Sequence, residues 1–220
     1  KYRTQQSQLS ELTSLFMFVV TLRCEHSCPY CQVSRQSQDK SAFDMPQEYA
    51  AKAIDFVFST PSRHVKVEFQ GGESLLNFEL IRWIVECVES KNSDAGRDIR
   101  FVIATNLAVV TDEILDYCSD HSILISTSLD GPRELHNANR PRPGHDSYQR
   151  AVDGIRCVRE RLGDDSVSAL MTTTRASLSQ PEAIIDEYVS QGFSSIFLRA
   201  LSPFGFAGKT GAVASYSTEE

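Results

Sequence analysis

The chain has 220 residues, of which 41% are hydrophobic and 23% are charged, and its formal net charge is −7. This composition is that of a folded globular domain and excludes a chain that is disordered over most of its length. No basic stripe interleaved with aromatic residues supports nucleic-acid binding, and we expect neither a membrane-spanning segment nor a signal peptide.

Segments typical of strands and of helices alternate along the chain. Apolar or alternating runs predict strands at 15–22, 65–70, 99–105, 122–129, 166–174 and 194–201. Amphipathic spacing predicts helices at 45–60, 74–90, 111–120, 147–163 and 179–192. The first strand, LFMFVVTL, is a nearly continuous apolar run, which predicts burial on both of its faces.

This alternation predicts an α/β fold in which parallel strands are joined by right-handed helical crossovers. Two arrangements fit the pattern, an open doubly wound sheet and a curved partial barrel, and periodicity does not separate them. In both arrangements ligands bind at the carboxyl ends of the strands. The loop after the first strand should therefore lie beside a ligand.

That loop contains the segment CEHSCPYC, in which Cys24, Cys28 and Cys31 have the spacing Cys-x3-Cys-x2-Cys. Thiolates so spaced can hold an iron–sulfur cluster. Zinc is an alternative that needs a fourth ligand, and His26 is interpreted as a loop side chain. Three idle thiols are the remaining alternative, and the clustering favours the iron–sulfur interpretation.

The other cysteines stand singly in predicted helices, and we interpret them as buried structural thiols: Cys87, Cys118 and Cys157. A secreted disulfide scaffold would be shorter and richer in loops. We therefore expect a cytoplasmic protein with one cluster or metal site and otherwise free thiols.

The cysteine loop resembles that of the radical S-adenosylmethionine (SAM) enzymes, whose signature is Cys-x3-Cys-x-aromatic-Cys after the first strand. Tyr30 stands at the aromatic position. The resemblance implies a partial (β/α)6 barrel of the radical SAM core type. It also implies a 4Fe–4S cluster held by Cys24, Cys28 and Cys31, with one iron left open for the amine and carboxylate of SAM.

The segment FQGGES follows the second predicted strand and is similar to the Gly-Gly-Glu motif of this family. By itself, the glycine pair indicates a tight turn or a close approach of the backbone to a ligand. The resemblance implies that Gly71, Gly72 and Glu73 contact the amino group of the SAM methionine.

The segment TSLDGPRELHNANRPRPG resembles the peptide-modifying branch of the family, typified by anaerobic sulfatase maturases. The resemblance implies that Ser128 and Arg140 hold the ribose and carboxylate side of SAM. A guanidinium group suits a bidentate contact with a carboxylate, and the alternative is a surface arginine in a basic, proline-rich loop.

Two further segments resemble the family. ATNLAVVT resembles a Thr-Asn-Gly turn in which Leu107 replaces the glycine, which leaves Asn106 as a polar contact to SAM. FLRALSPFG resembles the end of the sixth strand, which implies that the backbone near Leu201 flanks the adenine.

Within the family, CEHSCPYCQVSRQS, FDM and EFQGGESLLNFELI look most like the radical SAM maturase of the His-Xaa-Ser peptide system. The resemblance implies reductive cleavage of SAM and abstraction of a hydrogen atom from a ribosomally synthesised peptide, with cross-linking or side-chain oxidation as the outcome. A reducing electron donor such as flavodoxin or ferredoxin is the implied partner.

Two alternatives stay open at this stage. One is a radical SAM enzyme acting on a non-peptide substrate such as tRNA or a sugar nucleotide. The other is a zinc-stabilised α/β binding module without catalysis. The radical SAM resemblance implies an N-terminal extension at 1–14 and a radical SAM core domain at 15–205. At 206–220 it implies a tail or the start of a C-terminal extension of the kind that holds auxiliary clusters in this branch.

Overall fold

The computed structural model describes residues 13–210 and 215–217. Within them, six strands form one sheet in sequence order: β1 (Leu15–Thr21), β2 (His64–Gly71), β3 (Asp98–Ala104), β4 (Leu124–Ser128), β5 (Val167–Thr172) and β6 (Phe197–Arg199). All five pairings are parallel. Neighbours in the sheet are also neighbours in sequence, so every crossover advances in the same direction, as in a barrel. Since β6 does not pair with β1 in the described part of the chain, the barrel is partial, which confirms the predicted fold class.

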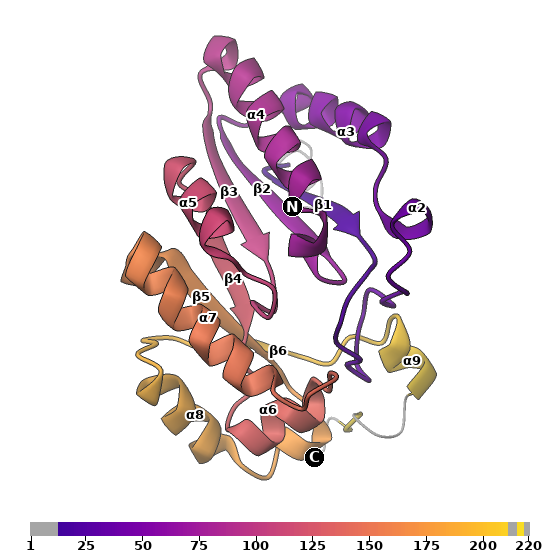
Figure 1. Cartoon of the computed structure of the whole chain (residues 1–220), viewed down its shortest axis with the longest axis vertical. Coiled ribbons are helices and arrows are strands. Elements are labelled where there is room, and N and C mark those ends of the chain that lie inside the picture. The colour runs from indigo at the N-terminus through magenta and orange to yellow at the C-terminus, as the bar shows by residue number, and fades with distance from the viewer. Residues whose placement is uncertain (1–12, 211–214, 218–220) are drawn as a thin grey trace, which may run out of the picture.

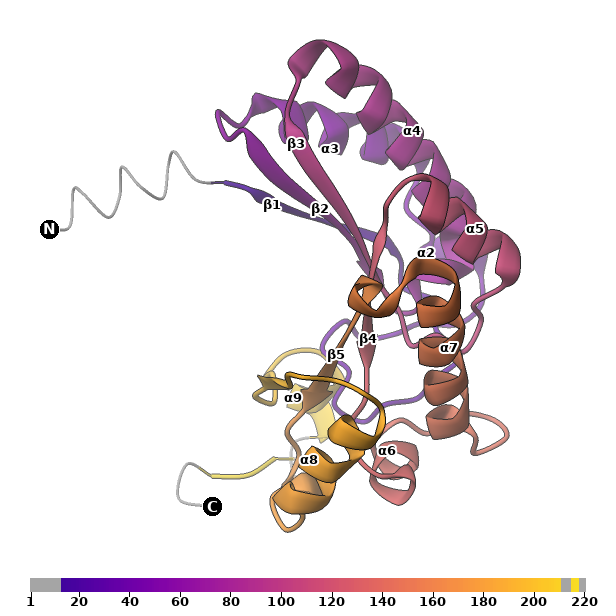
Figure 2. The ribbon, with the colours of Figure 1, turned by 90° about the vertical axis from the view of Figure 1, so that its left-hand side faces the viewer.

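The helices of the described residues are α2 (Lys40–Phe43), α3 (Gln47–Ser59), α4 (Phe78–Ala95), α5 (Asp112–Asp120), α6 (Arg133–Asn139), α7 (Ser147–Leu162), α8 (Pro181–Ser190) and α9 (Phe206–Thr210). Short 3-10 turns lie at Ser74–Asn77, Asp164–Ser166 and Arg175–Ser177. Figure 1 shows α3, α4, α5 and α7 running along the strands, and Figure 2 shows these four helices on one side of the curved sheet. None of these helices is long and apolar enough to cross a membrane.

Local sequence signals explain several helix ends. The Thr111 hydroxyl caps α5 by accepting a hydrogen bond from the Ile114 N–H at 3.4 Å. Pro181 is the first residue of α8, where its missing N–H costs nothing. Gly163, with φ of +97°, ends α7. The predicted helices are therefore confirmed to within a few residues at each end.

The core lies between the convex face of the sheet and these helices. Phe18, Phe69 and Phe101 stand side by side on β1, β2 and β3, with ring centroids 6.1 and 6.3 Å apart. The apolar faces of α3 and α4 cover them. A second, smaller cluster lies around Tyr188 under α8. Packing in these two clusters holds the strands in place, and the carboxyl ends of these strands carry the site.

The prediction that β1 is buried on both faces is wrong. Phe18 and Val20 are buried, whereas Leu15, Met17 and Val19 are 45%, 57% and 39% exposed. The helices cover only the convex face, so alternate residues of β1 line the open concave face.

Two other expectations need correction. Strand β6 spans three residues instead of the predicted eight. Of the single cysteines, Cys118 is buried, but Cys87 and Cys157 are only half-buried, since they lie at the margins of the core. The expected extension at 1–14 lies outside the described residues except for its last two, and the boundaries of the other two expected parts stay predictions.

Candidate functional site

A cavity of about 190 Å³ lies at the carboxyl ends of the strands. One wall is the loop after β1, and in the described residues it contributes three thiols, those of Cys24, Cys28 and Cys31. The opposite walls come from strand ends, including Gln70, Ala104, Ser128, Thr172 and Arg199. The fold therefore brings the predicted cysteine loop to the edge of the sheet where ligands of such folds bind.

The three cysteines are half-buried free thiols. Burial raises the pKa of Cys24 well above its ordinary value, and the negative charges of Glu25 and Glu73 raise it further. Burial likewise raises the pKa of Cys28 to about 12. Both thiols are therefore protonated until a cationic group binds, since metals and clusters take the thiolate form. Three convergent soft donors of this kind fit an iron–sulfur cluster.

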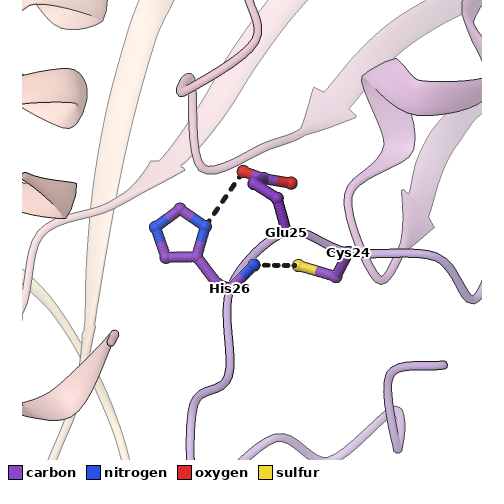
Figure 3. A group of neighbouring side chains, drawn as sticks. All are labelled: Cys24, Glu25 and His26. Carbon is purple, nitrogen blue, oxygen red and sulfur yellow. Dashed lines mark hydrogen bonds and ion pairs between the residues drawn. The ribbon is translucent and has the colours of Figure 1, made fainter. Parts of the chain in front are cut away.

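The first cysteine also belongs to a smaller group of possible ligands, shown in Figure 3. Ligand atoms of Cys24, Glu25 and His26 lie within 4.8 Å of one another. The His26 ring is buried, with Nδ1 2.9 Å from a Glu25 oxygen and 2.9 Å from Asn106 Nδ2. This trio could hold a single small ion, but it would leave Cys28 and Cys31 without a role.

Gly71 and Gly72 line the cavity at the end of β2. A Cβ added to Gly71 would clash with the Thr21 carbonyl oxygen, because the two atoms would lie well under 3.0 Å apart. A Cβ added to Gly72 would clash in the same way with the Arg23 carbonyl oxygen. The Gly72 N–H donates to the Thr21 carbonyl at 2.8 Å, and the Glu73 N–H donates to that of Arg23 at 2.7 Å. The glycine pair thus allows two stretches of backbone to meet where the cysteine loop begins.

Glu73 is buried behind this turn, outside the lining of the cavity. Its carboxylate accepts hydrogen bonds from the Thr105 hydroxyl at 2.7 Å, the Leu75 N–H at 3.0 Å and the Asn106 N–H at 2.7 Å. Burial raises the pKa of Glu73 to about 7, and the charge of Glu25 adds to the rise. Glu73 ties the turn after β2 to the turn after β3, and its predicted contact with SAM stays a prediction.

The turn after β3 carries Asn106, which lines the cavity, and Leu107, which does not. Asn106 Nδ2 donates to Glu25 at 2.7 Å, so it braces the first half of the cysteine loop. Leu107 has φ of +63°, a left-handed conformation that costs a leucine roughly 1–2 kcal/mol. The residue that replaces the expected glycine therefore keeps the glycine-like conformation, and its buried side chain packs against Gly154 of α7.

Arg140 is buried and lines the cavity, so the alternative of a surface arginine is wrong. Its Nε and Nη2 form a bidentate ion pair with the carboxylate of Asp130, at 3.0 and 3.1 Å. The same carboxylate accepts hydrogen bonds from the Tyr30 hydroxyl and from the Thr172 N–H. The Nε–Nη2 edge of the guanidinium is thus occupied by a protein carboxylate.

Asp130 is the residue that the sequence reasoning missed. It is fully buried, and the Arg140 charge is the main influence that holds its pKa below the ordinary value against the effect of burial. The available signal was an acidic residue in SLDG, directly after β4 and before a Gly-Pro turn.

Ser128 lines the cavity at the end of β4, as expected. Leu201 does not line it; its half-buried side chain packs against the small cluster of Tyr30 and Ala207. Its neighbour Ser202 does line the cavity. The predicted contacts of Ser128 and Leu201 with SAM stay predictions.

The fold and the site together define a partial barrel with a cysteine loop at the mouth of its cavity. The chain belongs to the radical SAM superfamily, whose family model matches residues 18–188. This membership selects the iron–sulfur interpretation over a zinc module, because a 4Fe–4S cluster and SAM are the cofactors of the family.

The relatives are longer than this chain. It is 28% identical over 185 residues to an uncharacterized protein of Methanocaldococcus jannaschii, which covers 84% of this chain and 61% of that protein. It is also 28% identical over 131 residues to the cysteine-type anaerobic sulfatase-maturating enzyme of Clostridium perfringens (strain ATCC 13124), which covers 58% and 35% of the two chains.

Among solved structures, the chain resembles native anSMEcpe with bound AdoMet and the Kp18Cys peptide, with a TM-score of 0.74 and 20% identity. The match covers 86% of this chain and 51% of that one. The comparisons thus confirm the predicted likeness to sulfatase maturases. The narrower likeness to the His-Xaa-Ser maturase stays a prediction.

Proposed function

We propose that this chain is the core of a radical SAM enzyme that modifies a ribosomally synthesised peptide or protein. The observation that carries the proposal is the convergence of the Cys24, Cys28 and Cys31 thiols on one cavity at the strand ends. When bound, the cluster and SAM supply one-electron cleavage of a carbon–sulfur bond and abstraction of a hydrogen atom from carbon.

The residues of the chain would bind and orient these groups. Cys24, Cys28 and Cys31 would hold three irons and leave the fourth for the amine and carboxylate of SAM. The turn at Gly71 and Gly72 would face the amino group. Ser128, at the end of β4, and Arg140, beside Tyr30, would face the ribose and carboxylate. The hydroxyl of Ser128 and the charged guanidinium of Arg140 can form hydrogen bonds with the polar groups of SAM.

The position of Arg140 refines this assignment. Asp130 accepts from Nε and from one N–H of Nη2, which leaves both N–H groups of Nη1 and the second N–H of Nη2 without a hydrogen bond to the described residues. The Nη1–Nη2 edge therefore remains open for a bidentate, charge-assisted contact with the SAM carboxylate.

A peptide substrate has more support than the alternatives. The name of the Clostridium perfringens relative describes maturation of a sulfatase, and the solved structure includes a peptide. The net charge of −7 opposes the binding of tRNA, whose phosphates attract cationic surfaces. The open concave face of the sheet, with exposed Leu15 and Met17 on β1, offers an apolar surface for a peptide. A small reducing protein such as flavodoxin or ferredoxin would supply the electron.

The first experiment tests the enzymatic proposal. The chain is loaded with iron and sulfide under anaerobic conditions, reduced with dithionite and mixed with SAM. Formation of 5′-deoxyadenosine, absent in the Cys31→Ser variant, is the expected result. A fully loaded chain that forms none would contradict the proposal.

The second experiment separates the substrate classes. Perdeuterated candidate peptides, tRNA and sugar nucleotides are supplied in parallel, and deuterium in 5′-deoxyadenosine is measured by mass spectrometry. Deuterium transferred from a peptide supports the proposal, and transfer only from a nucleotide or RNA favours the alternative.

A further inference from the structure

The second half of the cysteine loop, residues 27–32, contains Cys28 and Cys31 with Tyr30 between them. The Tyr30 side chain turns inward and is buried, with 6% of its surface exposed. Its hydroxyl donates to Oδ2 of Asp130, one hundred residues further along the chain. This side-chain contact joins the two cysteines to the end of β4.

Asp130 is itself held by separate elements. It is completely buried, and its Oδ1 accepts a hydrogen bond from the Thr172 N–H at 3.1 Å, at the end of β5. Arg140, directly after α6, contributes the bidentate ion pair, and the Asp130 N–H donates to Nδ1 of His136 within α6 at 3.3 Å. A carboxylate with this many partners has little freedom to move.

The residues around Arg140 add two further contacts to this attachment. Its guanidinium carbon lies 5.5 Å from the centroid of the Tyr30 ring, within the range of a cation–π contact. The next residue, Pro141, accepts a hydrogen bond from the Ser27 N–H at 2.7 Å. The Asp130–Arg140 pair thus contacts both the hydroxyl and the ring of Tyr30 and adjoins the start of the same loop half.

The first half of the loop, residues 24–26, has a different attachment. Glu25 and His26 contact Asn106 on the turn after β3. Losing the Asp130 attachment should therefore loosen residues 27–32 and leave residues 24–26 in place.

We propose that Asp130 is a positioning residue that fixes Cys28 and Cys31 before the cluster binds. Its significance for catalysis rests on the proposed function, in which these cysteines are cluster ligands. The attachment itself is a property of the chain without its cofactors.

Hydrogen exchange on the 220-residue chain without metal tests this proposal. In Tyr30→Phe, which removes only the hydroxyl, amides of 27–32 should exchange about tenfold faster, as expected for loss of one hydrogen bond to a charged group. Amides of 24–26 should change less than twofold. Asp130→Asn should loosen the same segment.

Tyr188→Phe is the matched control. Tyr188 is also buried, and its hydroxyl donates to the carbonyl of Leu129 at 2.7 Å, one residue before Asp130. The apolar cluster around Tyr188 includes no residue of the cysteine loop among the described residues. This variant should leave exchange in 27–32 within twofold of the parent, although it also removes a buried hydroxyl.

A second measurement is the rate at which a chelator removes iron from the loaded chain, followed by loss of visible absorption. Tyr30→Phe should lose iron several-fold faster than Tyr188→Phe. Exchange in 27–32 within twofold of the parent in Tyr30→Phe would overturn the proposal, even if Asp130→Asn fails to fold. If the parent binds no cluster, the proposed function fails, while the exchange data still decide whether Asp130 holds the loop.

Discussion

Replacing Gly72 by alanine should detach the cysteine loop from the sheet. An alanine Cβ at this position would lie 2.7 Å from both the Arg23 carbonyl carbon and the Leu22 carbonyl oxygen, and closer still to the Arg23 oxygen. These are backbone atoms, which cannot turn aside as a flexible side chain can. Gly72 does not have a positive φ, so the cost is steric rather than conformational.

The size of the effect follows from what must move. Separating the two stretches breaks the hydrogen bonds from Gly72 to Thr21 and from Glu73 to Arg23, each contributing about 1 kcal/mol. Overpacking adds about 1–3 kcal/mol. We therefore expect Gly72→Ala to lower the free energy of unfolding by about 3–5 kcal/mol, a large share of the roughly 5–15 kcal/mol typical of a domain.

Urea unfolding of the metal-free chain, followed by circular dichroism, measures this change, and iron content after anaerobic loading shows whether the loop still binds a cluster. Gly96→Ala is the control, because Gly96 has φ of +60° and no atom lies within 4 Å of its added Cβ. This variant should cost only about 1–2 kcal/mol of stability and should bind as much iron as the parent. A Gly72→Ala chain within 1 kcal/mol of the parent and fully loaded with iron would refute the reasoning.

Three further predictions concern the thiols, the buried acid and the packing of α7. Cys28→Ser should abolish cluster assembly, measured as bound iron and sulfide, whereas Cys87→Ser on α4 should leave both unchanged; retained iron in Cys28→Ser would contradict the site. The pKa of Glu73 is raised from its ordinary value of 4.5 to about 7, so the folded chain binds a proton on the Glu73 carboxylate more tightly than the unfolded chain does. The contribution of Glu73 to stability therefore falls as the pH rises from 4.5 to 7. The advantage of the parent over Glu73→Gln in urea unfolding should accordingly shrink by about 3 kcal/mol between pH 4.5 and pH 7, and a constant difference would contradict this. Gly154→Ala would place a Cβ 2.6 Å from the Cβ of Leu107 and should destabilise the metal-free chain by about 1–3 kcal/mol. A urea unfolding midpoint equal to the parent's would contradict this, because it would mean that the turn at Leu107 moves to make room.

Much of the fold could be predicted because strands and long helices have strong periodic patterns. Helix α6 was missed because seven residues between Pro132 and Pro141 are too few to show a period. The burial of β1 was predicted wrongly because a continuous apolar run does not reveal whether helices cover one face or two. The exposed Met17 and Val19 belong to a strand whose concave side faces the interior of an open barrel.

The site was predictable where its chemistry is local. Three cysteines within eight residues predict a soft metal centre from spacing alone. The Asp130–Arg140 pair was not predictable, because the two residues meet only after α6 turns the chain back. The role of Tyr30 depends on a contact across one hundred residues. Contacts of this kind arise from the tertiary fold and leave no mark in the local pattern.

The central claim is that Cys24, Cys28 and Cys31 hold a cluster with one iron open to SAM. Pulsed electron–nuclear double resonance on the reduced, loaded chain tests it directly, using SAM labelled with ¹⁵N in the amine and ¹⁷O in the carboxylate. The claim predicts hyperfine coupling of both labels to the cluster. A loaded cluster that shows coupling to neither label at saturating SAM would contradict it.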